Sequence, residues 1–205
     1  TAQGVVKRVN PELLVNRDEW EVIRLAEGDE LVGAVELRTG EEELCFVSTD
    51  AQLLHFGADL VRPQGRAGGG VAGIRLAAGQ RVVSFTAFTP AEDAVVVTVS
   101  GSSTALPGTE AGAVKVAPFT EYPAKGRATG GVRCHRFLKG EDTLLLAWAG
   151  PGPAHAAAAS GAPIDLPDAT GRRDGSGVPA AQPLAACSSP VSALHPAGTA
   201  SGVKG

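Results

Sequence analysis

An internal repeat is the feature that most constrains what this chain can fold into. Three segments share one frame, in which an arginine lies between apolar residues, a glycine and a polar residue follow, and a β-prone run comes next. The segments are Trp20 to Ala34, Val71 to Ala87 and Val132 to Trp148; Arg24, Arg75 and Arg136 coincide in this frame, as do Gly28, Gly79 and Gly140. Repeats of this size must stack on one another to bury their faces, which predicts a propeller-like array.

A second shared block precedes two of these segments. It reads P-x-(x)-G-R-x-x-G-G-V and covers residues 63–71 and 123–132. Residues 171–178 form a faded fourth copy, one residue longer, and the first repeat has no such loop. Glycine lets the backbone approach a neighbour closely, and arginine or lysine on such a loop can reach phosphates.

The composition favours short strands over helices. The chain has 27 glycines and 14 prolines among 205 residues, which leaves little room for long helices. Short β-rich runs bounded by turn residues cover residues 43–48, 94–99 and 143–148. We therefore expect an all-β fold of four-stranded blades. The expected blades are residues 1–42, 43–92, 93–148 and a degenerate 149–187, which form one domain of residues 1–187, and a disordered tail covers residues 188–205.

The first repeat contains one local conflict. Asn10 to Leu25, taken alone, favours a capped amphipathic helix. The repeat predicts strand and loop there instead, and we follow the repeat. The first repeat also lacks the leading strand that residues 43–48 supply to the second, so the chain is expected to begin inside a blade of a longer protein, truncated on its N-terminal side.

In their order and repetition, these motifs resemble the C-terminal domain of the A subunit of bacterial type IIA topoisomerases, the family of DNA gyrase and topoisomerase IV. The residues that carry the resemblance, within residues 1–150, are Val5 to Arg8, Ile23 to Leu25, Gly28 to Ala34, Arg62 to Arg66 and Tyr122 to Arg127. The resemblance implies a β-pinwheel, here a partial one, whose strands are exchanged between adjacent blades. It also implies that a basic rim binds and bends duplex DNA, without strong sequence preference, and presents it for strand passage.

The same resemblance sets expectations for the parent protein. It would need ATP and Mg²⁺ on other domains. The partners of this domain would be the rest of its own A subunit, together with an ATPase B subunit in a cytoplasmic heterotetramer. No cofactor is expected in this fragment. The family's nucleophilic tyrosine follows an arginine, whereas Tyr122 lies in E-Y-P-A-K, so no catalytic residue is expected here. The Q-R-R-G-G-K-G box of gyrases is absent and Asp174 stands where the pattern has glycine, which favours a topoisomerase IV-like protein over gyrase.

Basic residues are in register with the repeat although the formal net charge is −4. From Arg62 to Arg81 there are four basic residues and no acid, and from Lys115 to Lys139 there are six against Glu121, whereas acids gather between Asp18 and Glu43. Basic loops at blade spacing would follow a curved rim, and DNA that follows such a rim must bend. The predicted DNA-binding residues are Lys7, Arg8, Arg62, Arg66, Lys115, Lys125, Arg127, Arg133, Arg172 and Arg173.

Two other functions stay open. A propeller-like protein-interaction module would use the acidic first repeat and apolar rims, and it should show no salt-dependent DNA binding. A stand-alone enzyme is less favoured, because the G-R-x-x-G-G loop lacks the G-K-[ST] of a nucleotide-binding loop and the four histidines have no metal-ligand spacing. We therefore predict no metal site. The three cysteines form no C-x-x-C pair, which favours a reducing compartment, and no apolar run is long enough to span a membrane.

Overall fold

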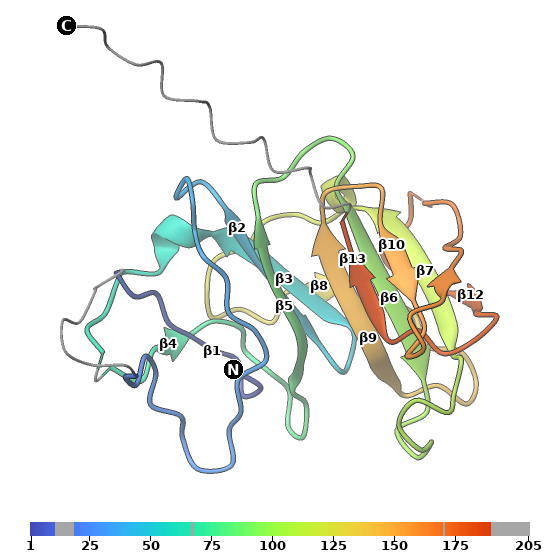
Figure 1. Cartoon of the computed structure of the whole chain (residues 1–205), viewed down its shortest axis with the longest axis horizontal. Coiled ribbons are helices and arrows are strands. Elements are labelled where there is room, and N and C mark those ends of the chain that lie inside the picture. The colour runs from blue at the N-terminus through green and yellow to red at the C-terminus, as the bar shows by residue number, and fades with distance from the viewer. Residues whose placement is uncertain (11–18, 67, 170, 190–205) are drawn as a thin grey trace, which may run out of the picture.

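The computed structural model describes residues 1–10, 19–66, 68–169 and 171–189 (Figure 1). The strands are β1 (Val5–Val6), β2 (Glu43–Ser48), β3 (Gln52–Gly57), β4 (Val71–Ala72), β5 (Val82–Phe88), β6 (Val95–Gly101), β7 (Ala113–Pro118), β8 (Val132–Arg133), β9 (Thr143–Gly150), β10 (His155–Ala157), β11 (Pro163–Ile164), β12 (Val178–Pro179) and β13 (Ala186–Ser188). Two short 3₁₀ helices, η1 (Ala58–Leu60) and η2 (Phe119–Glu121), complete the elements. The described residues contain no α-helix, and the all-β prediction is confirmed.

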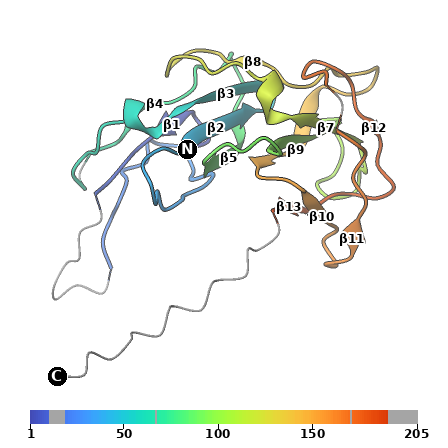
Figure 2. The same cartoon turned by 90° about the horizontal axis from the view of Figure 1, so that it is seen from above.

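Two four-stranded antiparallel sheets form the body of the molecule. One has the strand order β5-β2-β3-β8 and the other β12-β7-β6-β9. They lie side by side, with β5 packed against β9 (Figure 1). The predicted β-rich runs are β2, β6 and β9. The pair β1–β4 precedes these sheets and a small sheet of order β11-β10-β13 follows them, so that the sheets succeed one another in chain order (Figure 2).

In three of the four sheets, an outer strand comes from the next repeat along the chain. β4, β8 and β12 each follow a glycine-rich basic block directly, and they pair with β1, β3 and β7 of the preceding repeat. The valine that ends each block has an equivalent partner: Val71 lies opposite Val6, Val132 opposite Leu53 and Val178 opposite Val114. The faded fourth copy thus occupies the same structural position as the two clear ones, and the expected strand exchange is present.

A glycine precedes each exchanged strand because two backbones approach closely there. Gly70 and Gly131 have φ angles of 90° and 72°, in the left-handed region that glycine alone adopts without cost. A Cβ on Gly131 would lie 2.3 Å from the carbonyl oxygen of Leu53. The G-G-V motif therefore has a structural cause, since it threads the strand of one repeat onto the sheet of another.

Tight turns confirm the alignment of the three repeats. Gly28, Gly79 and Gly140 have φ angles of 72°, 77° and 94°. In each turn, the N–H of the following residue donates to the carbonyl three residues earlier; the pairs are Asp29 to Ala26, Gln80 to Ala77 and Glu141 to Leu138. The coincident glycines of the sequence are therefore the same corner, used three times.

The core lies in layers between successive blades, as a propeller-like array requires. One cluster joins the β1–β4 region to the β2–β3 sheet, a second fills the space between the two four-stranded sheets, and a third lies between β6–β7 and the small sheet. Representative members of the three clusters are Val6 and Phe46, Cys45 and Phe119, and Val97 and Leu184. All three cysteines are free thiols.

The first repeat is less regular than its alignment predicts. Residues 31–37 align with β5 and β9, yet they form no strand. β5 pairs with β2 and β9 pairs with β6, and the described part of the first repeat has no counterpart of β2 or β6. This segment therefore has no sheet to join. Residues 19–25 form no helix, while residues 11–18 of the ambiguous segment lie outside the described residues.

The C-terminal part of the chain forms a small sheet of its own and donates one strand to the preceding sheet. Residues 149–187 hold β10 and β11 and give β12 to β7. β13 ends at Ser188, which lies opposite His155, so pairing continues one residue past the predicted end of the domain. Residues 190–205 of the predicted disordered tail lie outside the described residues. The blade boundaries after residues 42, 92 and 148 stay a prediction.

Candidate nucleic-acid interface

Three glycine- and arginine-rich segments lead into the exchanged strands. We call them the first basic loop (residues 62–70), the second basic loop (residues 123–131) and the third basic loop (residues 171–177). Each begins in its own repeat and ends on the sheet of the preceding one. The three loops are therefore placed at successive junctions between blades (Figure 2).

The first basic loop presents two of the predicted residues. Arg62 and Arg66 are exposed. Gln64 fastens the loop, since its side-chain oxygen accepts the N–H of Gly70 at 3.0 Å and its backbone N–H donates to the carbonyl of Arg8 at 2.8 Å. The backbone bond thereby ties the start of the loop to the segment that follows β1, and the side-chain bond closes the loop on itself.

Lys7 and Arg8 face the backbone of this loop region. The Lys7 ammonium donates to the carbonyl oxygens of Val22 at 2.6 Å and Arg66 at 2.8 Å. The Arg8 guanidinium is half-buried and donates to the carbonyl of Ala58 at 3.2 Å. In this arrangement both predicted phosphate contacts hold protein backbone.

The second basic loop is fastened by its own basic residues. The N–H of Lys125 donates to the carbonyl of His55 at 3.1 Å, and its exposed side chain donates to the carbonyl of Gly131 at 3.3 Å. The half-buried Arg127 reaches across the blade junction, where its guanidinium donates to the carbonyl of Ala72. The loop is therefore bonded both to β3 of the sheet that receives β8 and to β4 of the sheet before it.

Ala128 gives the second basic loop a strained turn. Its φ angle is 64°, in the left-handed region that costs an L-residue about 1 kcal/mol. The N–H of Ala128 donates to the carbonyl of Gly73 at 2.7 Å, which stabilises this conformation. Arg133, just after the loop, is exposed on β8.

The third basic loop is fastened by backbone and by a buried histidine. The N–H of Arg136 donates to the carbonyl of Gly175 at 3.0 Å, and the N–H of Gly177 donates to Nε2 of His135 at 3.2 Å. Arg172 is exposed, and its Nε lies 4.0 Å from the carboxylate of Asp174, which partly offsets its charge. Arg173 is half-buried.

His135 is held as a neutral imidazole. Because Nε2 accepts a hydrogen bond from Gly177, Nδ1 carries the proton and donates to the Thr98 hydroxyl oxygen at 2.8 Å. Burial, and then the nearby charge of Lys115, lower the pKa of His135 to about 4. The imidazole, which follows β8 in the chain, therefore links β6 to the third basic loop without a charge.

Lys115 corrects the prediction for the third repeat. It was expected to contact phosphate, but its side chain is 3% exposed. Its ammonium donates to the carbonyls of Arg173 at 2.7 Å and Arg172 at 3.4 Å, and to the Tyr122 hydroxyl at 3.4 Å. Burial lowers the pKa of Lys115 to about 8. β7 lies between two packed layers, so both faces of the strand are inside the molecule and the lysine has no route to a bound ligand.

The corner arginines lie beside the loops, and they were not among the predicted contacts. The N–H of Arg75 donates to the carbonyl of Thr129 in the second basic loop at 3.0 Å, as Arg136 does to the third. Arg24 lies next to Gly69 of the first basic loop, and its guanidinium pairs with Glu21 at 3.5 Å. All three arginines are exposed. Their coincidence in the repeat was the signal that could have identified them.

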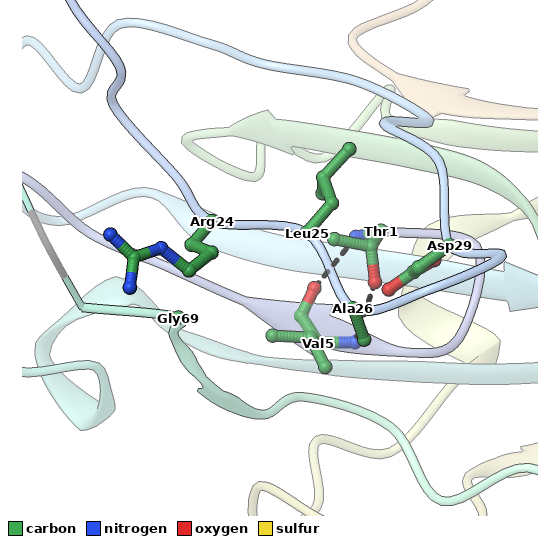
Figure 3. Close-up of a pocket in the computed structure, with 7 residues that line it drawn as sticks. All are labelled: Thr1, Val5, Arg24, Leu25, Ala26, Asp29 and Gly69. Carbon is green, nitrogen blue, oxygen red and sulfur yellow. Dashed lines mark hydrogen bonds between the residues drawn. The ribbon is translucent and has the colours of Figure 1, made fainter.

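A pocket lies near the N-terminus, and Arg24 is one of its lining residues. Thr1, Val5, Leu25 and Asp29 are among its lining residues. The Arg24 side chain points away from these residues, on the side of Gly69 (Figure 3). The Thr1 amino group donates to the Val5 carbonyl at 2.6 Å and is therefore already bonded within the chain.

Tyr122 lies in the layer between the two four-stranded sheets, 3% exposed, and burial raises the pKa of its phenol. This position fits packing, as its sequence context indicates.

Among the described residues, no helix combines the length and the apolar character that crossing a membrane requires.

Known proteins are similar to this chain in sequence. A family model described as the DNA gyrase C-terminal domain, beta-propeller, matches residues 42–88 and 108–145. The A subunit of DNA gyrase from Escherichia coli K12 is 37% identical over 134 residues, and that from Staphylococcus epidermidis is 35% identical over 161 residues. The chain belongs to the DNA gyrase C-terminal domain family.

Solved structures of this family share the fold. The C-terminal domain of DNA topoisomerase IV superposes with a TM-score of 0.65 at 22% identity, covering 81% of this chain and 51% of that one. The gyrase A C-terminal domain gives a TM-score of 0.59 at 18% identity, covering 81% and 56%. The propeller-like architecture predicted from the repeat is therefore confirmed.

The chain corresponds to a small part of the gyrase A proteins that it matches. The alignment to the E. coli protein covers 64% of this chain but 14% of that protein, and the alignment to the S. epidermidis protein covers 71% and 17%. Topoisomerase subunit TopoM of Mycolicibacterium smegmatis is 35% identical over 105 residues, which is 51% of this chain and 13% of that protein.

Proposed function

We propose that this gyrase-type C-terminal domain binds double-stranded DNA along the basic loops at its blade junctions and wraps the DNA around that rim. The observation that carries the proposal is the shared register of the loops. The second and third basic loops end in equivalent exchanged strands, and each lies beside a corner arginine, Arg75 or Arg136, of the preceding repeat. Each pair of a basic loop and a corner arginine is thus built from two repeats, and such pairs recur at blade spacing.

The proposed contacts are the exposed or half-exposed basic side chains of this rim. They are Arg62, Arg66, Arg75, Lys125, Arg127, Arg133, Arg136, Arg172 and Arg173. These groups can bind phosphate oxygens, which carry no sequence information, so recognition rests on charge and on the cost of bending DNA. We therefore expect weak sequence preference and a strong dependence on salt.

In the whole protein, the domain would serve the A subunit of an ATP-dependent type IIA topoisomerase. It would present bent DNA to a catalytic core on other domains, which act with an ATPase B subunit in the cytoplasm. The absent glutamine-arginine box and the acid at Asp174 support a topoisomerase IV-like mode, in which the domain guides DNA without driving negative supercoiling.

The test is a binding titration with a duplex of arbitrary sequence at low salt. Joint substitution of Arg66, Lys125 and Arg127 by alanine should weaken binding at least tenfold, because three phosphate contacts are removed. The control is joint substitution of Arg38 in the acidic segment and Arg81, which pairs with Glu30, and it should change affinity less than twofold. Unchanged affinity in a correctly folded triple variant would sink the proposal.

A protein-interaction role is the second candidate. The first repeat exposes apolar side chains among its acids, including Trp20 (40% exposed), Leu31 (54%) and Val35 (45%). Such a surface fits a protein partner better than DNA. If this is the main role, the wild-type domain should give no salt-dependent binding to duplex DNA in the same titration.

A further inference from the structure

Two blades carry a lysine at the same place beneath a basic loop. Lys7 follows Val6, the partner of the exchanged Val71, and Lys115 follows Val114, the partner of the exchanged Val178. The Lys7 ammonium donates to the Arg66 carbonyl in the first basic loop at 2.8 Å. The Lys115 ammonium donates to the Arg173 carbonyl in the third basic loop at 2.7 Å. Both lysines thus bond the backbone of an arginine that belongs to the next repeat.

We propose that Lys7 and Lys115 are positioning residues, which fix the loop arginines for phosphate binding without touching DNA themselves. The inference rests on the proposed DNA-binding function for its final step, but the loop ordering can be measured without DNA.

The geometry gives two physical effects. A carbonyl bonded to an ammonium fixes the peptide plane that follows the arginine, and such charge-assisted bonds are stronger than neutral ones. The Arg172 and Arg173 carbonyls also both turn towards Lys115. Their partial negative charges therefore lie on the inner side of the loop, and the outer side is left to the guanidinium groups.

The middle blade shows what happens without the lysine. Leu54 occupies the equivalent position after Leu53, the partner of Val132, and it is 1% exposed in the core. There the second basic loop is held by its own side chains, since Lys125 and Arg127 donate to backbone carbonyls. The fold therefore accepts leucine at this register. Replacing either lysine by leucine introduces the residue that the equivalent position of the middle blade already has.

The first arm of the test uses Lys115→Leu and follows amide hydrogen exchange without DNA. The amide of Gly177 reports on the third basic loop, and the amide of Ala128 reports on the second as an internal control. We expect exchange at Gly177 to become about tenfold faster and exchange at Ala128 to stay unchanged. Equal exchange at Gly177 in the variant and the wild type would overturn the proposal for Lys115.

The second arm uses Lys7→Leu, whose lysine lies nearer the surface, so the test remains decisive if Lys115→Leu does not fold. Exchange at Gly68, whose N–H donates to Gly65 in the same turn, should accelerate, and duplex affinity should fall about threefold. Lys7→Arg should restore both. A fall in affinity with unchanged exchange would mean that Lys7 touches phosphate directly, which contradicts a positioning role. If the wild type binds no DNA, the proposed function fails, whereas accelerated exchange would still establish the ordering of the loops.

Discussion

The second and third basic loops occupy equivalent positions, but they are stabilised in opposite ways. The second is held by its own side chains, because Lys125 and Arg127 donate to backbone carbonyls. The third is held by residues outside the loop, Lys115 and His135, and its Arg172 faces Asp174. The same strand exchange can therefore present two differently tuned basic surfaces. In the proposed DNA-binding role, supporting residues in the neighbouring sheet would decide how many loop cations remain available to phosphate.

The largest expected effect is on stability, and it compares alanine substitutions at the glycines that precede β8 and β12. Gly131→Ala combines a positive φ with a Cβ 2.3 Å from a backbone oxygen, so it should destabilise the domain by about 4 kcal/mol or more. At Gly177 the corresponding contact is 2.7 Å from the Ala113 carbonyl carbon, and the cost should be smaller. Urea unfolding measures both. Gly126, which has no neighbour within 4 Å of a Cβ, is the control, and an equal loss in Gly126→Ala would refute the close-approach account.

The next effect concerns pH and should originate at His135, beside the third basic loop. The pKa of His135 is lowered from 6.5 to about 4, so between these values the unfolded chain binds the proton and the folded chain does not. The contribution of His135 to the free energy of unfolding should therefore be fully present above pH 6.5. The free energy of unfolding should fall by on the order of 2–3 kcal/mol as the pH drops to 4. Urea unfolding across this range should show the fall in the wild type and a weaker response in His135→Gln.

Local hydrogen exchange sharpens the pH comparison. The Gly177 amide, which donates to His135, should lose protection as the pH falls, after correction for the intrinsic rate. The Ala128 amide donates to a carbonyl and should keep its protection. Parallel loss at both amides would mean that the histidine does not act on the third loop in particular.

Paired substitutions compare what the two loops contribute to DNA binding. Lys125→Ala with Arg127→Ala should lower duplex affinity about tenfold, whereas Arg172→Ala with Arg173→Ala should lower it about threefold, because Asp174 already offsets part of the third loop's charge. Fluorescence anisotropy at one fixed salt concentration measures both. Equal losses would show that the acid has no influence.

The smallest effect is a gain. Asp174→Asn removes the carboxylate 4.0 Å from Arg172, and duplex affinity should rise about twofold, since an exposed ion pair is worth less than about 1 kcal/mol. The same substitution made with Arg172→Ala should give no gain. A gain that persists without Arg172 would attribute the effect to net charge alone.

The sequence predicted the architecture well because the repeat constrains it. Gly28, Gly79 and Gly140 form the same turn, and even the faded copy that ends at Val178 lies in the predicted register. Whether an individual basic side chain points into the molecule or towards the surface was harder to predict. Lys115 lies between Val114 and Val116 in a strand buried on both faces, so its charge points inward, although the sequence pattern places it in a basic stripe.

The corner arginines were missed for a related reason. Arg75 and Arg136 come from the repeat that precedes each basic loop, and they reach the loop through pairing across the blade junction. Treating one repeat at a time separates residues that the strand exchange brings together.

The salt dependence of duplex binding tests the central claim most directly. We expect log K to fall linearly with log salt between about 50 and 200 mM, with a slope of about −0.9 for each phosphate contact. Lys125→Ala with Arg127→Ala should make the slope shallower by about 2, and Arg38→Ala with Arg81→Ala should leave it unchanged. Equal slopes for the wild type and the Lys125 and Arg127 double variant, or no binding at the lowest salt, would contradict a phosphate-binding rim.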